Sequence, residues 1–373
     1  MFHLPRKIKT TTSKLIWLGL ATTLLLVGCG GEEVRHEENI LVYPPPPEPA
    51  RFIFERTIRS SFDVKEITGS DKLKLFATGS VGTATGLGKP YGVAVYKGRI
   101  YVTDTVKRGV LMFDVPGKDF KIFGTEGPGA LAKPIGIEVS KEGEIFVADN
   151  SAKRIVVFNA DGEFLRAFGD RSILSRPSGV AVSPDGLRAY VIDTGGVTTQ
   201  EHHLYIFNAK TGELEKTVGT RGREDGEFNL ALQVTTADDG TVYVTDSGNF
   251  RVQAFTPDGD HKFSFGTVGR KVGNFARPKG IATDAEGNIY VVDSAFGNFQ
   301  IFNDKAELLM FIGQRGQQPY PGLYMLPAGI DVDEDGRVYM VDQFHRKVDV
   351  FRPAGIEKDG GYLGGEHLRK PKS

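Results

Sequence analysis

The sequence has very little cysteine, tryptophan or continuous apolar character. Among its 373 residues there is one cysteine, Cys29, and one tryptophan, Trp17. A single thiol forms no intrachain disulfide and supplies no C-x-x-C pair for a metal and no C-x-x-C-H site for covalent haem. The apolar segment at residues 15–27 is interrupted by two threonines and is shorter than the ~20 residues that a transmembrane helix needs. Disulfide frameworks and cysteine-based metal sites are therefore excluded.

Residues 1–28 are typical of a signal peptide, because a basic leader precedes the short apolar segment. The segment across its end, Leu26-Val27-Gly28-Cys29, resembles the bacterial lipobox, in which a peptidase cuts before a cysteine whose thiol has been acylated. The resemblance implies that Cys29 is a lipid attachment site, and acyl chains such as palmitate, at ~0.8 kcal/mol per buried methylene, anchor a protein to a membrane. Gly30, in place of the aspartate that retains lipoproteins at the inner membrane, favours the outer membrane. The alternatives are a cleaved secretory peptide and a chance buried cysteine.

The net charge disfavours a nucleic-acid partner. The whole chain carries −1, and residues 1–28 contain four positive charges and no negative ones, so the remainder carries −1 − 4 = −5. A mildly acidic body binds phosphate backbones poorly.

Residues 29–50 combine the lipidated cysteine with a charged, proline-rich tether. Four consecutive prolines at 44–47 favour an extended polyproline II spacer of ~3.1 Å per residue between the membrane and the next domain. The alternative is that the prolines form a recognition site for a partner.

One phrase recurs six times from residue 89 onward, which indicates a repeat architecture. KPYGVAVYKGRIYVTD at 89–104 returns as KPIGIEVSKEGEIFVAD at 133–149 and as RPKGIATDAEGNIYVVD at 277–293. Each copy ends on an aspartate, and these are Asp104, Asp149, Asp193, Asp246, Asp293 and Asp342. β-Branched and aromatic runs separated by turn glycines such as Gly98 and Gly143 predict four-stranded antiparallel blades.

The sequence therefore predicts an all-β fold, a six-bladed β-propeller over residues 51–352 with a loose C-terminal tail at 353–373. After Phe351 no fourth strand follows, whereas KLKLFATG at 72–79 matches the outermost strand of the other blades. We expect an N-terminal strand, at 72–79, to complete the last blade and close the ring.

The xPxG opening, the VxD segment and the trailing R-x-x-x-F pattern resemble the NHL-repeat family, which is related in shape to the TolB-like six-bladed propellers. The resemblance covers residues 72–352. It departs from the pattern at Gln233, which replaces a glycine, and at residues 195–203, which interrupt a loop. Fold resemblance by itself implies little about chemistry.

Six equivalent aspartates suggest either a ring of metal ligands or a structural device. A residue that is repeated in every blade at the end of a strand favours the second interpretation, in which each carboxylate accepts backbone hydrogen bonds from an adjoining loop. Catalytic sites usually break the symmetry of a repeat, because chemistry needs different residues in different roles.

The loops that break the symmetry are the better candidates for a binding site. The loops between second and third strands share a face with the connections between blades, and this face is expected to carry Arg108, Arg154, Arg251 and Arg346. The charged connection at 219–230 and the segment at 313–327, with Arg315, Tyr320 and Tyr324, lie on the same face. Arginine and tyrosine are enriched at protein interfaces, which makes 313–327 the first candidate for partner binding. The alternative is a surface loop whose tyrosines pack on the blades.

An enzyme acting on a small molecule at the central tunnel is the rival hypothesis. Amidating lyases of similar fold use several histidines for zinc, and here only His202, His203 and His345 fall on the expected face. A calcium-dependent lactonase would need a carboxylate and amide cluster at the tunnel, where Asp331 and Asn229 are the candidates. The main prediction includes no cofactor; the alternative is a calcium- or zinc-dependent hydrolase or lyase.

The sequence therefore favours a lipid-anchored lipoprotein of the bacterial cell envelope, at the outer membrane, whose propeller is a protein-binding scaffold. The expected partner is another envelope protein, with no nucleic acid involved.

Overall fold

The structure, a computed structural model, describes residues 41–66, 76 and 84–368. The predicted signal peptide, Cys29 and nearly all of segment 72–79 lie outside the described residues.

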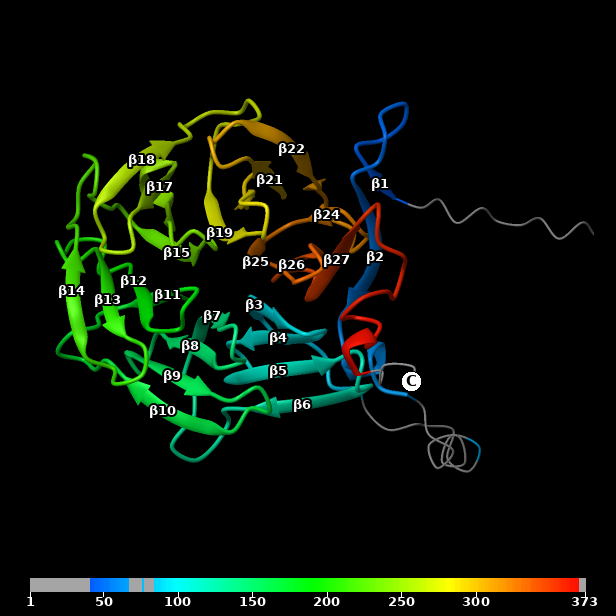
Figure 1. Ribbon diagram of the computed structural model, residues 1–373, viewed down its shortest axis with the longest axis horizontal. Coiled ribbons are helices and arrows are strands. Elements are labelled where there is room, and N and C mark those ends of the chain that lie inside the picture. The colour runs from blue at the N-terminus through cyan, green and yellow to red at the C-terminus, as the bar shows by residue number, and fades with distance from the viewer. Residues whose placement is uncertain (1–40, 67–75, 77–83, 369–373) are drawn as a thin grey trace, which may run out of the picture. The chain divides into compact units, whose positions relative to one another are not determined.

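Six antiparallel sheets are arranged as blades around one centre (Figure 1). Blade 1 consists of β3 (Pro90–Tyr96), β4 (Arg99–Asp104), β5 (Gly109–Asp114) and β6 (Asp119–Phe123). Blade 2 consists of β7 (Pro134–Val139), β8 (Ile145–Asp149), β9 (Arg154–Phe158) and β10 (Phe164–Phe168). Blade 3 consists of β11 (Pro177–Val182), β12 (Arg188–Asp193), β13 (His203–Asn208) and β14 (Leu214–Val218).

Blades 4 and 5 consist of β15 (Ala231–Thr236), β16 (Val242–Asp246), β17 (Arg251–Phe255) and β18 (His261–Phe265); and of β19 (Pro278–Thr283), β20 (Ile289–Asp293), β21 (Asn298–Phe302) and β22 (Leu308–Ile312). Blade 6 combines β25 (Pro327–Val332), β26 (Val338–Asp342) and β27 (Lys347–Pro353) with the N-terminal β2 (Phe52–Ile58) and the short β1 (Val42–Tyr43). This confirms the predicted all-β six-bladed propeller.

The hydrophobic core lies between the blades, because the inner strands of each blade are covered on both faces by the neighbouring blades. Every residue of β8 and β20 is buried, whereas the first four residues of the outermost strand β22 alternate between half-buried and exposed positions. Aromatic side chains link neighbouring blades, as where Phe123 of blade 1 meets Phe158 of blade 2 with ring centroids 5.0 Å apart. Full burial of such a side chain contributes ~1.5–3 kcal/mol.

An N-terminal strand closes the ring, as the sequence predicts, but it is a different segment from the expected one. β2 pairs with β27 over Phe52 to Ile58, which places residues 52–58, and not 72–79, in the outermost position of blade 6. The two strands lie side by side in Figure 1. The expectation was wrong because residues 72–79 and residues 52–58 both have the sequence pattern of an outer strand. That pattern does not indicate which of the two N-terminal segments pairs with β27.

Buried ion pairs hold this closing strand. Arg337 is completely buried, and its Nε donates to Glu55 of β2 at 2.8 Å while its Nη1 donates to Asp335 at 2.8 Å. Its Nη2 donates to the carbonyl oxygen of Gly360 at 2.8 Å. One guanidinium group therefore joins the N-terminal strand, the last blade and the C-terminal segment.

Two expectations about the ends of the propeller were wrong. The described part of the C-terminal segment, 353–368, is not loose: the backbone N–H of Asp359 donates to Glu55 at 2.7 Å, and Leu363 is only 2% exposed. The proline stretch is not an extended spacer up to residue 50, because β1 pairs with β2 and the prolines form the turn between them. Among the described residues no helix is long and apolar enough to cross a membrane.

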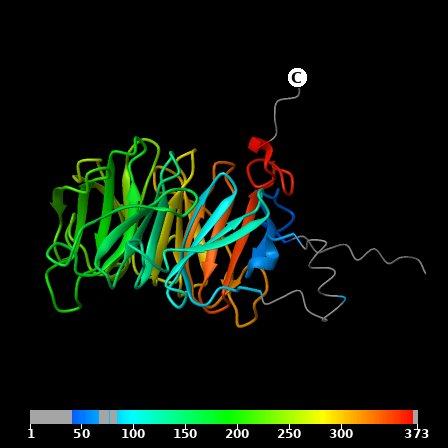
Figure 2. The same cartoon turned by 90° about the horizontal axis from the view of Figure 1, so that it is seen from below.

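The propeller has two dissimilar faces. The loop face consists of the loops between second and third strands and of the connections between blades, including residues 313–326. The hairpin face consists of the turns between first and second strands and between third and fourth strands. Seen edge-on in Figure 2, the 313–326 connection (orange) and the C-terminal segment 354–368 (red) project from opposite faces.

Candidate partner-binding face

The six repeated aspartates are buried and hold the loop face together. Asp104 accepts the backbone N–H of Gly88 at 2.6 Å, and Asp342 accepts those of Met325 and His345 at 2.7 Å. The other four carboxylates also accept N–H groups from the segment before the first strand of their own blade; these are Asp149, Asp193, Asp246 and Asp293. The carboxylates therefore satisfy loop backbone groups that have no partner in a strand ladder.

Residues 313–326 are held rigidly on the loop face. β23 (Gln314–Arg315) and β24 (Leu323–Tyr324) form a short parallel pair within this connection. Below it the buried ammonium group of Lys347 donates to the carbonyl oxygen of Tyr320 at 2.7 Å and pairs with Asp349 at 2.6 Å. A loop fixed in this way loses little conformational entropy when it binds a partner.

Three residues of this connection were predicted to contact a partner, and the structure separates them. Arg315 and Tyr320 are exposed, and the tyrosine side chain is 63% accessible. Tyr324 is completely buried, with the Lys347 ammonium group 4.7 Å from its ring centroid, so its predicted role as a contact residue is wrong. Alternation along β24 turns Tyr324 toward the core, which the loop sequence alone does not reveal.

The four arginines predicted for this face occupy two different positions. Arg108 and Arg346 follow the repeated aspartate by four residues and are exposed, each with φ of 52°. Arg154 and Arg251 follow it by five residues and bind loop backbone or carboxylate groups: Arg154 Nη2 donates to the carbonyl oxygen of Ala130 at 2.8 Å, and Arg251 Nε donates to Asp246 at 3.0 Å. Of these four arginines, therefore, only Arg108 and Arg346 are exposed to solvent.

Exposed apolar side chains accompany these charges, and sequence reasoning missed them. Phe344 is 56% exposed beside Arg346, and Val106 is 64% exposed beside Arg108. Others lie in loops of the same face, at Val197, Val268 and Val272. An apolar residue inside a polar turn, as in DTVKRG and DQFHRK, is the sequence signal that could have found them.

The loop face is also more basic than the chain as a whole. Its exposed cationic side chains include Arg59, Lys89, Lys107, Arg108, Lys133, Arg171, Arg176, Arg223, Arg270, Lys271, Arg277, Arg315 and Arg346. Its exposed carboxylates are fewer, and they are Asp63, Glu126, Asp170, Glu201, Glu224 and Asp225. The loop face therefore combines exposed positive charge with exposed apolar side chains.

The cavity in the central tunnel is small. Its volume is about 20 Å³, because glycines of the innermost strands bring neighbouring blades close together. A Cβ atom at Gly92 would lie 2.6 Å from the carbonyl oxygen of Ile135, and one at Gly329 would lie 2.6 Å from that of Tyr91. Both glycines are therefore required for the ring to close so tightly.

Two carboxylates line this tunnel, Glu138 of β7 and Asp331 of β25. Burial raises the pKa of Glu138 from 4.5 to about 7, while the backbone N–H of Val139 lowers it. Burial, and then the charge of Glu138, raises the pKa of Asp331 well above its ordinary value, although Asp331 accepts the N–H of Val95 at 2.7 Å. Sequence reasoning named Asp331 but missed Glu138.

The other residues considered for a metal or lactonase site are engaged elsewhere. His202 and His345 each place Nε2 3.0 Å from a loop carbonyl oxygen, and His203 places Nδ1 2.8 Å from one. Asn229 does not line the tunnel, and its side-chain amide donates to the carbonyl oxygen of Gly248 at 3.3 Å. Over the described part of the chain, no group of three or more histidine, cysteine, aspartate or glutamate side chains is placed to hold a metal ion.

Comparison with known proteins supports the repeat and the fold. A family described as 6-bladed beta-propeller matches residues 84–168, and the NHL repeat family matches residues 228–255. The E3 ubiquitin-protein ligase TRIM71 of Mus musculus is 43% identical over 75 residues, which is 20% of this chain and 8% of that protein. The tripartite motif-containing protein 3 of Mus musculus is 30% identical over 153 residues, 36% of this chain and 21% of that protein. The chain thus matches only a small part of these relatives.

Solved structures show the same fold at low sequence identity. A protein of unknown function from Bacteroides thetaiotaomicron superposes with a TM-score of 0.57 at 17% identity, covering 73% of this chain and 71% of that one. A streptogramin B lyase gives a TM-score of 0.53 at 16% identity, covering 71% of this chain and 94% of that one. Likeness at this identity establishes the propeller fold and leaves the chemistry to the site itself.

Proposed function

We propose that this chain, a six-bladed propeller built of NHL-type repeats, is a protein-binding scaffold that docks its partner on the loop face. We propose further that acylated Cys29 holds it at a bacterial envelope membrane, the outer membrane, and that the partner is another envelope protein. The observation that carries the docking proposal is the rigid 313–326 connection, which exposes Arg315 and Tyr320. It contacts the loop that carries Phe344 and Arg346, where His345 Nε2 lies 3.0 Å from the carbonyl oxygen of Gly316.

The geometry suits binding better than chemistry. A closed ring presents several loops at fixed spacing, so little entropy is lost on association. Exposed arginine and aromatic side chains supply the residue types that dominate binding energy at interfaces. The membrane anchor rests on the lipobox resemblance at Cys29, and it would confine scaffold and partner to one surface, which raises their effective concentration.

Site-specific photo-cross-linking in intact cells tests the docking face. A photoreactive amino acid is placed at position 320 or 344 on the loop face, or at position 187 on the hairpin face, where Leu187 is 56% exposed. We expect one envelope protein to cross-link from 320 and from 344 but not from 187, and the cross-link to be lost when Arg315 and Arg346 are changed to serine. Equal cross-linking from both faces, or none from 320 and 344, would refute the proposal.

The anchor is tested separately by fractionation. Cys29→Ser should move the protein from the membrane fraction to the soluble fraction and abolish incorporation of labelled palmitate. If the variant stays with the outer membrane, the lipid is not the anchor, whatever the outcome of the cross-linking.

A further inference from the structure

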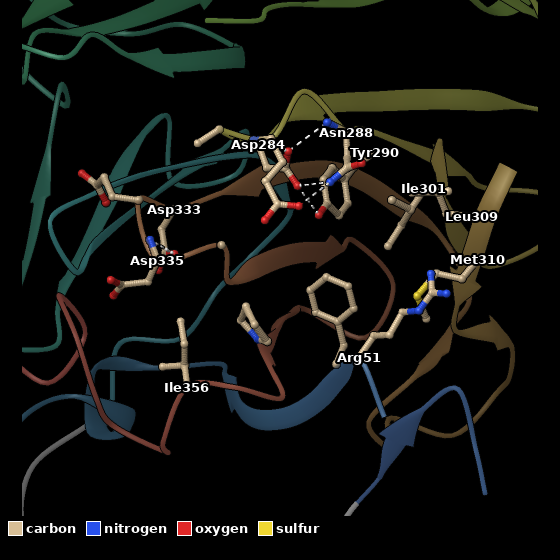
Figure 3. Close-up of a pocket in the computed structure, with 16 residues that line it drawn as sticks. Arg51, Asp284, Asn288, Tyr290, Ile301, Leu309, Met310, Asp333, Asp335 and Ile356 are labelled. Atoms are coloured by element: carbon tan, nitrogen blue, oxygen red, sulfur yellow. Dashed lines mark hydrogen bonds between the residues drawn. The ribbon is translucent and has the colours of Figure 1, made fainter. Parts of the chain in front are cut away.

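A cleft of about 490 Å³ opens on the hairpin face between blades 5 and 6, away from the loop face. Its floor is apolar, formed by side chains that include Phe52, Ile301, Leu309, Met310 and Ile356. Its rim is acidic: Asp284 and Glu286 come from the blade 5 turn, and Asp333, Glu334 and Asp335 come from the blade 6 turn, with Arg51 as a basic lining residue (Figure 3). The volume is that of a typical ligand pocket.

In two of the corresponding grooves on this face, an arginine side chain bridges neighbouring blades. In blade 1, Arg99 reaches the turn between third and fourth strands of blade 2, where its Nη1 donates to Asp161 at 2.8 Å and to the carbonyl oxygen of Ala160 at 3.2 Å. Arg188 of blade 3 does the same toward blade 4, with Asp258 at 2.7 Å and the carbonyl oxygen of Pro257 at 3.1 Å. In both grooves an internal guanidinium group bridges two blades.

In the groove between blades 5 and 6, no arginine among the described residues occupies the equivalent position. The equivalent position, five residues before the repeated aspartate, is Asn288, whose side-chain amide folds back to Asp284 at 2.8 Å. Tyr290, which corresponds to Tyr101 and Tyr190, likewise donates to Asp284 at 2.8 Å, whereas those two donate to carbonyl oxygens of the next blade. The neighbouring turn is missing as well, because β27 and β2 come from opposite ends of the propeller and no hairpin connects them. Ring closure by an N-terminal strand therefore leaves this groove without that turn and without a bridging guanidinium group. The groove between blades 3 and 4, which has both, still contains a cleft of about 430 Å³.

Part of the negative charge in the cleft is already engaged. Asp335 pairs with the buried Arg337, and Asp333 accepts the hydroxyl of Tyr339 at 2.8 Å. Glu286 is exposed, and its closest hydrogen-bond donor, the Asn288 amide, is 3.5 Å away. Glu334 is also exposed, and its two oxygens share one donor, the backbone N–H of Lys97 in blade 1, at 3.0 and 3.3 Å. Glu286 and Glu334 thus retain acceptor capacity on opposite sides of the cleft.

We infer that this cleft binds an arginine side chain of an extended peptide segment of a partner protein, with its guanidinium group between Glu286 and Glu334. The arginine bridges blades 5 and 6 as Arg99 and Arg188 bridge their own blades, but its acceptors come from the turns between first and second strands, because the turn between third and fourth strands is missing in blade 6. Adjoining apolar side chains of the peptide lie on Leu309 and Met310. A peptide fits better than a small amine because β22, which carries Leu309 and Met310, is the edge strand of blade 5 and offers main-chain groups for pairing. This site is independent of the proposed loop-face function.

The test measures fluorescence anisotropy of a labelled, capped pentapeptide of alternating valine and arginine with the full chain in non-ionic detergent. The matched ligand has citrulline in place of arginine and so keeps the shape without the charge. We expect the arginine peptide to bind at least tenfold more tightly, because charge-assisted hydrogen bonds are lost with citrulline. Glu286→Gln should weaken binding roughly tenfold. Glu142→Gln, at the same turn position in blade 2, should leave it unchanged.

In a second variant, an arginine side chain of the protein itself occupies the proposed site. Asn288→Arg restores the internal guanidinium group that blades 1 and 3 carry, and we expect it to abolish peptide binding while the protein keeps its thermal stability. The proposal is overturned if both peptides bind equally, if neither binds at millimolar concentration, or if Asn288→Arg binds like the wild type. It is also overturned if deletion of residues 369–373, RKPKS, is needed before the peptide binds, because the occupant is then the chain's own basic end.

Discussion

Replacing Glu138 by glutamine should remove much of the pH dependence of stability that the central tunnel imposes. Burial raises the pKa of this carboxyl group from 4.5 to about 7, so the folded protein holds the proton more tightly than the unfolded chain does. Between these two pH values the folded state binds more protons, and stability therefore falls as pH rises through this window. Below pH 4.5 both states are protonated and nothing is lost.

The magnitude follows from the size of the shift. A rise from 4.5 to about 7 corresponds to about 3 kcal/mol of stability lost by pH 8, at 1.36 kcal/mol per pKa unit. Glu138→Gln carries no charge, so it should be close to the wild type at pH 5 and more stable at pH 8 by as much as about 3 kcal/mol. The pKa of Asp331 should also fall, because the charge of Glu138 contributes to its elevation.

Urea unfolding of the full chain at pH 5 and pH 8 measures this effect, with Glu142→Gln on the exposed turn of the same blade as the control. The control should keep the wild-type difference between the two pH values. The reasoning fails if Glu138→Gln keeps that difference too, or if the variant is less stable than the wild type at pH 8.

The other predictions concern ring closure and the two faces. Arg337→Met leaves Glu55 buried without its partner and should lower the free energy of unfolding by about 3–5 kcal/mol, measured by urea unfolding; an effect under about 1 kcal/mol would contradict the closure role. The two carboxylate oxygens of Asp149 accept the backbone N–H groups of Ala132 at 2.8 Å and Lys133 at 2.9 Å. Asp149→Asn replaces one of these acceptors by an amide NH2 group and should lower the free energy of unfolding by about 1–3 kcal/mol in the same assay. Tyr324→Ala should destabilise the fold by about 3–5 kcal/mol, whereas Tyr320→Ala should leave the melting temperature unchanged and weaken only partner cross-linking. Raising salt should weaken that cross-linking further, because exposed arginines carry the attraction.

The repeat made the architecture predictable. Each copy contains the same sequence of apolar runs, turn glycine and terminal aspartate, so six weak signals agree on one blade, and the fact that the last copy lacks a fourth strand implies closure from the N-terminus. The sequence could not identify the closing segment, because 52–58 and 72–79 are both plausible outer strands. Only the pairing of β2 with β27 and the burial of Glu55 against Arg337 decide between them.

The candidate sites were predicted less completely than the fold, for a physical reason. Local sequence indicates which residues lie in loops of one face, and Arg108, Arg315, Tyr320 and Arg346 do lie exposed there. It does not indicate which loop side chains turn inward, so Tyr324 was assigned to the surface and Phe344 was overlooked.

The sequence alone determined the blade, the number of blades and the place of the repeated aspartates, because these depend on contacts between residues close in the chain. The tertiary structure decided the narrow tunnel with Glu138 and Asp331, the buried Arg337 network and the open cleft beside Asn288. Each of these arises where segments distant in sequence meet across the closed ring, and no local pattern of residues encodes that meeting.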